Sequence, residues 1–171
     1  NGIVTKKVIT AFERFRDVNA RPLGRALEIN VNEDLTTELS RAAKLARHWL
    51  AERQADILIW GHVPPAGSPV HIHFISLATW DEWIPGGFDL TTDLPLPAHL
   101  SGPYADFLHA ATLSATVPAS RDKAKMRLAA LPDAAAMAGI AMDDIPPDMT
   151  SRERAALYLC HGNILSSAWS A

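Results

Sequence analysis

The sequence predicts an α/β (α+β) fold, in which a small mixed or antiparallel sheet with a central hairpin is packed by helices and followed by a helical extension. Two apolar stretches, residues 55–63 (ADILIWGHV) and 70–77 (VHIHFISL), have the length of strands and flank a loop rich in proline and glycine. Before this pair, apolar residues recur at intervals of three and four, which is the helical period. From residue 120 onward, the apolar patterns are helical.

The segments before the hairpin predict two helices and one strand. Residues 4–18 form an amphipathic pattern with Val4, Val8 and Phe12 on one face, which predicts a helix. Residues 25–32 (RALEINVN) alternate between apolar and polar side chains, which predicts a half-buried strand. Residues 35–54 carry a long apolar stripe, and Asp34 stands where a helix N-cap is expected.

The hairpin has a predictable register. If Val63 pairs with Val70, then Trp60 faces His73 and His62 faces His71. One face of the hairpin is then wholly apolar and is expected to cover the core. The opposite face is mixed and is expected to be partly open to solvent. This mixed face carries Leu58, Trp60, His62, His71, His73 and Ile75.

After the hairpin, residues 86–92 (GGFDLTT) predict a fourth strand, and a helix is expected to begin at Pro103 after a cap at Ser101 and to end before Pro118. Helices are expected over residues 120–131 and 133–139, followed by a proline linker over residues 142–149. Thr150 and Glu153 have the spacing of a capping box at the start of the last helix. We therefore expect an α/β domain over residues 1–118 and a helical extension over residues 119–171.

Composition excludes several classes of function. The net charge of −3, with acids and bases interspersed, disfavours a nucleic-acid partner, and the sequence has no apolar run long enough to insert into a membrane. The single cysteine, Cys160, cannot form an internal disulfide and is expected to be a buried thiol. The expected compartment is the cytoplasm. Because the sequence begins at Asn1, an upstream targeting segment remains open.

Three histidines on the mixed face raise the question of a metal site. His71 and His73 point to the same side of one strand, and His62 on the neighbouring strand supplies a third nitrogen. A zinc ion held there would support a hydrolase or hydratase, with Asp81 or Glu82 as the base. The favoured interpretation is structural, because no carboxylate nearby in the sequence orients these histidines as metal ligands usually require.

No other signature of catalysis or of cofactor binding is found in the sequence. It contains no GxxxxGK[ST], GxGxxG, GxSxG or HExxH motif, so no cofactor is expected. Trp80 and Trp83, in TWDEWIPGG, are amphipathic residues that suit either the rim of a binding surface or the packing of a loop over the sheet.

The hairpin resembles that of TolB-like amino-terminal α/β domains, which in bacterial proteins stand in front of tetratricopeptide repeats. The hallmark "aDxLIWGxV" is matched by residues 55–63, and an "LRF"-like strand is matched by IHF at residues 72–74, although His71 and His73 depart from the usual pattern. Tyr158, Gly162 and Leu165 also have the spacing found in a first repeat helix.

This resemblance implies a non-catalytic module that binds, docks or senses within a larger bacterial protein. It carries over no catalytic residue. The expected partner is another protein or a second copy of the chain, and the expected binding surface is the mixed face together with the loop after it: Trp60, His62, His71, His73, Trp80 and Trp83.

Overall fold

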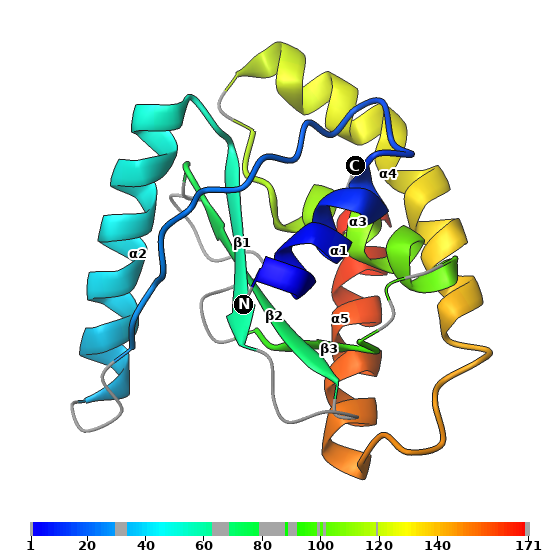
Figure 1. Ribbon diagram of the computed structural model, residues 1–171. Coiled ribbons are helices and arrows are strands. Elements are labelled where there is room, and N and C mark those ends of the chain that lie inside the picture. Colours follow the sequence, from blue (N-terminus) through cyan, green and yellow to red (C-terminus); the bar gives the residue numbers. More distant parts are fainter. Residues whose placement is uncertain are drawn as a thin grey trace.

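The computed structural model describes residues 2–29, 34–62, 69–78, 88, 92–98, 100, 102–118 and 120–169. The described strands form an antiparallel sheet in the order β1-β2-β3, with β1 (Ile57–His62) and β2 (Val70–Ser76) as the hairpin and β3 (Leu94–Leu96) beside β2 (Figure 1). Helices pack around this sheet, and helices alone make up the carboxyl-terminal part. The fold class expected from the sequence is therefore confirmed.

The predicted register of the hairpin is also confirmed. Trp60 pairs with His73 and His62 pairs with His71 across the ladder. Val70, Ile72 and Phe74 point to the core face and are buried. The two histidines of β2 on the mixed face are only partly exposed, with 18% of the His71 side chain and 16% of the His73 side chain accessible.

The strand that joins the hairpin was not anticipated. The expected fourth strand over residues 86–92 lies outside the described residues apart from Phe88 and Thr92. The third strand of the described sheet is the short segment Leu94–Leu96, which pairs with residues 70–72 of β2. Its central residue, Pro95, has no N–H to donate and is therefore suited to an edge strand.

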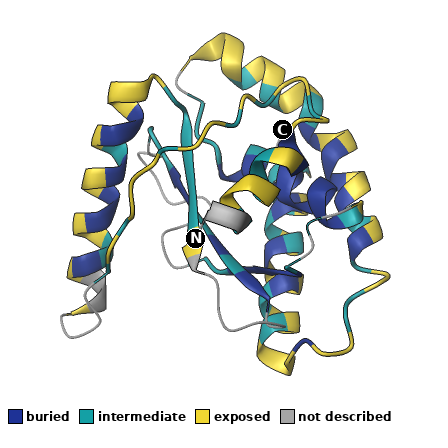
Figure 2. Cartoon of the chain, viewed as in Figure 1, coloured by how far each residue is buried: buried dark blue, intermediate teal, exposed yellow. Residues whose placement is uncertain are grey.

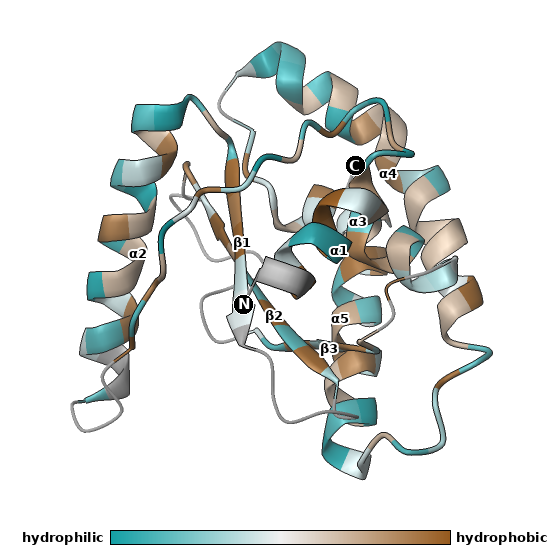
Figure 3. Cartoon of the chain, viewed as in Figure 1, coloured by the Kyte–Doolittle hydropathy of each residue, from teal (hydrophilic) through white to brown (hydrophobic). Residues whose placement is uncertain are grey.

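Helix α2 (Leu35–Arg53) confirms the longest amphipathic pattern. The Asp34 side chain accepts a hydrogen bond from the Thr37 N–H at 2.8 Å, as expected of an N-cap. Figure 3 shows hydrophilic and hydrophobic residues alternating along this helix, and its buried side carries Ala42, Ala46 and Leu50. Helix α2 contacts both strands of the hairpin.

The strand expected over residues 25–32 is wrong for its described part. Residues 25–29 are irregular, and residues 30–32 lie outside the described chain. Instead of pairing with a strand, this segment is held against α2: the Arg41 guanidinium donates to the Glu28 carbonyl, and Arg25 forms an ion pair with Glu52. The alternation of apolar and polar residues in this segment therefore arises because one side of it lies against helix α2, and it does not indicate a strand.

Four further helices are described besides α2. They are α1 (Gly2–Phe12), α3 (Pro103–Ala115), α4 (Arg121–Ala141) and α5 (Ser151–Trp169). Helix α3 lies at the centre of this group and is buried along almost its whole length (Figure 2). It begins at Pro103 as expected, but its N-cap is Gly102, at φ 51° and without a side-chain cap, rather than Ser101. Glycine tolerates this positive φ at little cost.

Helix α4 is continuous where the sequence suggested two helices. Pro132 lies inside it and gives up one backbone hydrogen bond, and Gly139 does not end it. Packing explains the continuity, because Leu131, Ala135 and Ala138 on either side of these positions are buried in the core. In the final helix, the capping box of Thr150 and Glu153 is confirmed in both directions.

One apolar core joins both ends of the chain. It contains Phe12 of α1, Phe74 of β2, Phe107 of α3 and Ile164 of α5. The boundary expected at residue 118 therefore falls in a connection between helices that share this core. Among the described helices, none has the length and apolar character needed to cross a membrane.

Candidate functional site

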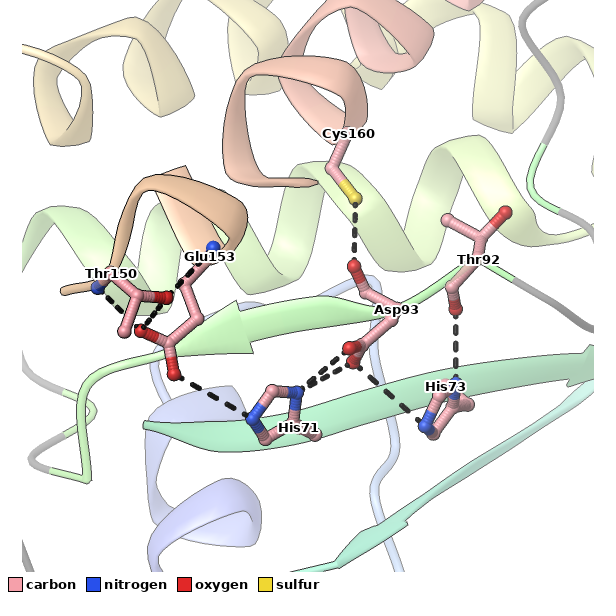
Figure 4. A network of polar contacts seen from close by, with 7 residues as sticks. All are labelled: His71, His73, Thr92, Asp93, Thr150, Glu153 and Cys160. Atoms are coloured by element: carbon pink, nitrogen blue, oxygen red, sulfur yellow. Dashed lines mark hydrogen bonds and ion pairs between the residues drawn. The ribbon is translucent and has the colours of Figure 1, made fainter. Parts of the chain in front are cut away.

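The candidate site is a cluster of polar side chains where β2 meets the start of β3 and the first turn of α5. Figure 4 shows Asp93 between His71 and His73, with Glu153 on the other side of His71. Strand β2 supplies both histidines, and the antiparallel register brings residue 93 opposite His73. Long-range pairing, and not closeness in sequence, assembles this cluster.

His71 lies between two carboxylates. Its Nδ1 is 2.8 Å and 3.0 Å from the two carboxylate oxygens of Asp93, and its Nε2 is 4.0 Å from Oε1 of Glu153. Because an ionised carboxylate can only accept, the Nδ1–H of His71 donates to Asp93, and Glu153 lies on the other side of the ring. The imidazole therefore ties the hairpin to β3 and to α5.

His73 is fixed by a different set of contacts. Its Nδ1 is 3.1 Å from the Thr92 carbonyl oxygen, and its Nε2 is 3.9 Å from Oδ1 of Asp93. The Trp60 ring stacks on the imidazole at a centroid distance of 4.6 Å and an interplanar angle of 26°. Contacts on both sides of the ring therefore fix its orientation.

Glu153 serves both the cluster and the helix. Its carboxylate accepts from the Thr150 hydroxyl at 2.7 Å and from the Thr150 N–H at 2.6 Å. These two hydrogen bonds and, to a smaller extent, the nearby His71 lower the pKa of Glu153 below its ordinary value. The N-terminus of α5 is thus anchored next to the histidines.

Cys160 borders the cluster on the side that faces the core. Its thiol lies 3.6 Å from the Asp93 carbonyl oxygen. Burial, and to a lesser extent the Asp93 charge, raises the pKa of this thiol to about 12. The expectation of a buried thiol is therefore confirmed, and the thiol is protonated at neutral pH.

The structure corrects one argument made from the sequence. No carboxylate was evident near the histidines, yet Asp93 contacts both of them and Glu153 lies close to His71. These residues are about 20 and 80 positions away along the chain. Only a correct prediction of β3, with its register, would have placed Asp93 opposite His73.

The expected binding residues are brought together in part. Trp60, His71 and His73 gather on the mixed face as predicted. For His62, the backbone pairs with His71, but its side chain lies outside what the structure describes. Trp80 and Trp83, with the proposed bases Asp81 and Glu82, also lie outside the described residues.

The histidines are oriented as metal ligands often are. Nδ1 of His71 lies next to the Asp93 carboxylate, and Nδ1 of His73 lies next to the Thr92 carbonyl oxygen. Even so, no three His, Cys, Asp or Glu side chains within the described ranges are arranged to hold a metal ion. The zinc alternative with His62, His71 and His73 therefore depends on a side chain that the structure does not describe.

We expect purified chain without an affinity tag to contain far less than one zinc ion per molecule. The physical reason is that zinc sites use three or four protein ligands, and no three suitable side chains among the residues that the structure describes are arranged to hold an ion. Elemental analysis beside a His71→Ala, His73→Ala double variant checks this. About one zinc per chain that disappears in the double variant would contradict the structural interpretation and establish the metal site.

Two buried side-chain nitrogens have no hydrogen-bond partner in the described part of the chain: Trp60 Nε1 and His161 Nε2. The Trp60 ring borders the cluster through its stacking on His73. His161 lies between α5 and α3, with its ring 6.0 Å from that of Phe107. Burial lowers the pKa of His161 below its ordinary value of 6.5.

This lowered pKa predicts acid sensitivity. Below about pH 6.5, the unfolded chain binds a proton at His161 that the folded chain resists, so the free energy of unfolding falls as the pH falls. Above that pH the two states bind equally and the effect vanishes. We expect His161→Leu to weaken this pH dependence, as measured by urea unfolding at several pH values. An unchanged slope in the variant would contradict the prediction.

A hollow of about 300 Å³ lies between the segment after α1 and helix α4. Three of its polar side chains are engaged: His109 Nε2 is 2.9 Å from Asp17, the Phe15 ring stacks on His109 at 3.9 Å, and Arg14 forms an ion pair with Asp106. These contacts join α1 and the segment after it to α3.

Comparison with known proteins gives no further guidance. No protein-family model matches the chain, and no significant match is found among curated proteins or solved structures.

Proposed function

We propose that this chain is a protein-interaction module, working within a larger bacterial protein in the cytoplasm. The resemblance of the hairpin to TolB-like domains supports a docking role, and the mixed face with Trp60, His71 and His73 remains one candidate surface. The observation that carries the proposal lies elsewhere, on helix α5.

Helix α5 exposes a continuous apolar surface, which we call the α5 stripe. Four large residues in it are exposed, three of them strongly: 58% of Tyr158, 63% of Leu159, 88% of Trp169 and 37% of Leu165 are accessible. Between residues 155 and 169 the sequence contains no Asp, Glu, Lys or Arg. The α5 stripe consists of Ala155, Tyr158, Leu159, Gly162, Leu165 and Trp169.

Such a surface favours protein binding for a simple physical reason. Single exposed apolar residues are ordinary, but a contiguous uncharged patch that includes tyrosine and tryptophan is typical of interfaces. Covering it removes apolar area from water, and there is no charge in it to desolvate. The other side of the same helix, with Leu157, Cys160 and Ile164, is already buried in the core.

Photo-cross-linking tests this proposal. Benzoylphenylalanine placed at Tyr158 is expected to form protein adducts in living cells, whereas the same probe at Met126, which is 67% exposed on α4, is not. A Leu159→Glu substitution in the same chain should abolish the Tyr158 adducts. Equal labelling from both positions, or no protein adduct from Tyr158, would contradict the proposal.

A further inference from the structure

The residues on either side of Gly162 can be compared in pairs along the face of α5 that carries the stripe. With about 3.6 residues per turn, positions three, four and seven residues before and after a given residue lie on the same face of a helix. Leu159 and Leu165 stand at three, and Tyr158 and Ser166 stand at four. Ala155 and Trp169 stand at seven. Of these three pairs, only Leu159 and Leu165 are alike, whereas Tyr158 and Trp169 are each paired with a small residue.

This pairing of large with small residues makes the face complementary to itself. If two α5 helices lie antiparallel about a two-fold axis at Gly162, each residue meets the one at the opposite distance from Gly162. Leu159 then meets Leu165 of the second copy, and Tyr158 meets Ser166. The large Trp169 meets the small Ala155. The two leucines thus face one another, and the two bulky aromatic side chains face small residues.

Gly162 suits the centre of such a pair. A methyl group added at Gly162 would have no atom within 4 Å, so this point of the helix surface is open. Without a side chain, two helices can approach closely where they cross. The stretch between residues 155 and 169 has no ionisable carboxylate, lysine or arginine, so no like charges would meet.

The exposed area suits a weak interface. Tyr158, Leu159, Leu165 and Trp169 together expose on the order of 500 Å² per chain, given that a large aromatic side chain covers about 150–250 Å². Two copies would bury at most about 1,000 Å² in total, which is below the roughly 1,200–2,000 Å² of stable interfaces. A weak, reversible dimer is therefore expected.

We propose that the partner of the α5 stripe is a second copy of this chain, with the two α5 helices antiparallel about Gly162. This inference rests on the proposed interaction function and names the occupant of the surface.

Sedimentation equilibrium of the chain over a range of concentrations tests the dimer. The wild type is expected to dimerise reversibly, and Leu159→Glu should weaken the dimer about a hundredfold or more because each interface would bury two unpaired charges. Met126→Glu, on α4 and outside the stripe, is the matched control and should dimerise as the wild type does. A monomer at every concentration, or a dimer that Leu159→Glu leaves intact, would overturn the proposal.

Disulfide cross-linking tests the orientation. A Tyr158→Cys chain is mixed with a Ser166→Cys chain and oxidised mildly. The antiparallel register predicts cross-links between unlike chains, whereas a parallel pair would cross-link like chains and overturn the register. The native thiol interferes little, because Cys160 is fully buried and its pKa is raised to about 12.

The two proposals fail in different ways. Adducts from Tyr158 to a different protein, combined with a monomer in sedimentation, would reject the homodimer and leave the interaction function standing. A monomer that also gives no protein adduct from Tyr158 would reject both.

Discussion

Gly61→Ala is expected to unfold the hairpin or to lower the free energy of unfolding by about 3 kcal/mol or more. A Cβ atom at this position would lie 2.0 Å from the His71 carbonyl oxygen and 3.1 Å from its carbonyl carbon. Both atoms belong to the backbone of the paired strand, so no side chain can rotate away. The strands would have to separate where the ladder pairs Gly61 with Ile72.

Urea unfolding and amide hydrogen exchange of β1 and β2 measure this effect. Gly139→Ala in α4 is the matched control, because a methyl group there would lie 3.9 Å from His161 Nε2, which is an ordinary van der Waals contact. There the substitution should stabilise the chain by about 0.5–1 kcal/mol, since alanine favours the helix. A Gly61→Ala chain as stable as the wild type would show that the two strands are farther apart than the structure describes.

Arg14→Ala is expected to lower the free energy of unfolding by about 2 kcal/mol. Arg14 forms an ion pair with Asp106 of α3, whose side chain is only 10% exposed. Without the guanidinium, Asp106 would remain nearly buried and without its cation. The expected loss of unfolding free energy is smaller than for a fully buried ion pair, because Arg14 itself is 43% exposed and its charge is screened by solvent.

A double-mutant cycle separates this ion pair from other effects of the substitution. In an Asp106→Asn background, the same Arg14→Ala change should be much less costly, because no buried charge is left behind. Equal losses in both backgrounds would instead assign the effect to the packing of Arg14 over the Phe15 ring, which lies 4.9 Å away. Thermal or urea unfolding of the four chains gives the coupling energy.

The hairpin shows how far the sequence alone can lead. Its register was predictable because side chains alternate with a period of two, so one placement makes one face of the hairpin wholly apolar. The sequence did not reveal the role of Gly61, because a clash with the opposite backbone depends on how closely the strands approach. The caps at Asp34 and Thr150 were predictable because capping is a contact between residues three positions apart.

The histidine cluster shows where that reasoning stops. The sequence predicted that Trp60 and His73 would meet, but it gave no sign of Asp93, because β3 is three residues long and contains a proline. Glu153 was recognised as a cap, and its approach to His71 follows only from the packing of α5 beside β3. The same holds for the α5 stripe. The spacing of its residues could be read from the sequence, but their exposure to solvent could not.

By itself, then, the sequence determined the fold class, the hairpin register, the main helices and two of their caps. These depend on periodicity and on contacts between near neighbours, and both are determined by residues that are close together in the sequence. Only the tertiary structure decided that residues 25–29 lie along α2 without forming a strand, that α4 continues through Pro132, and that His71 lies between Asp93 and Glu153. Each of these depends on burial or pairing between distant segments, which overrides local preference when the packing energy is larger.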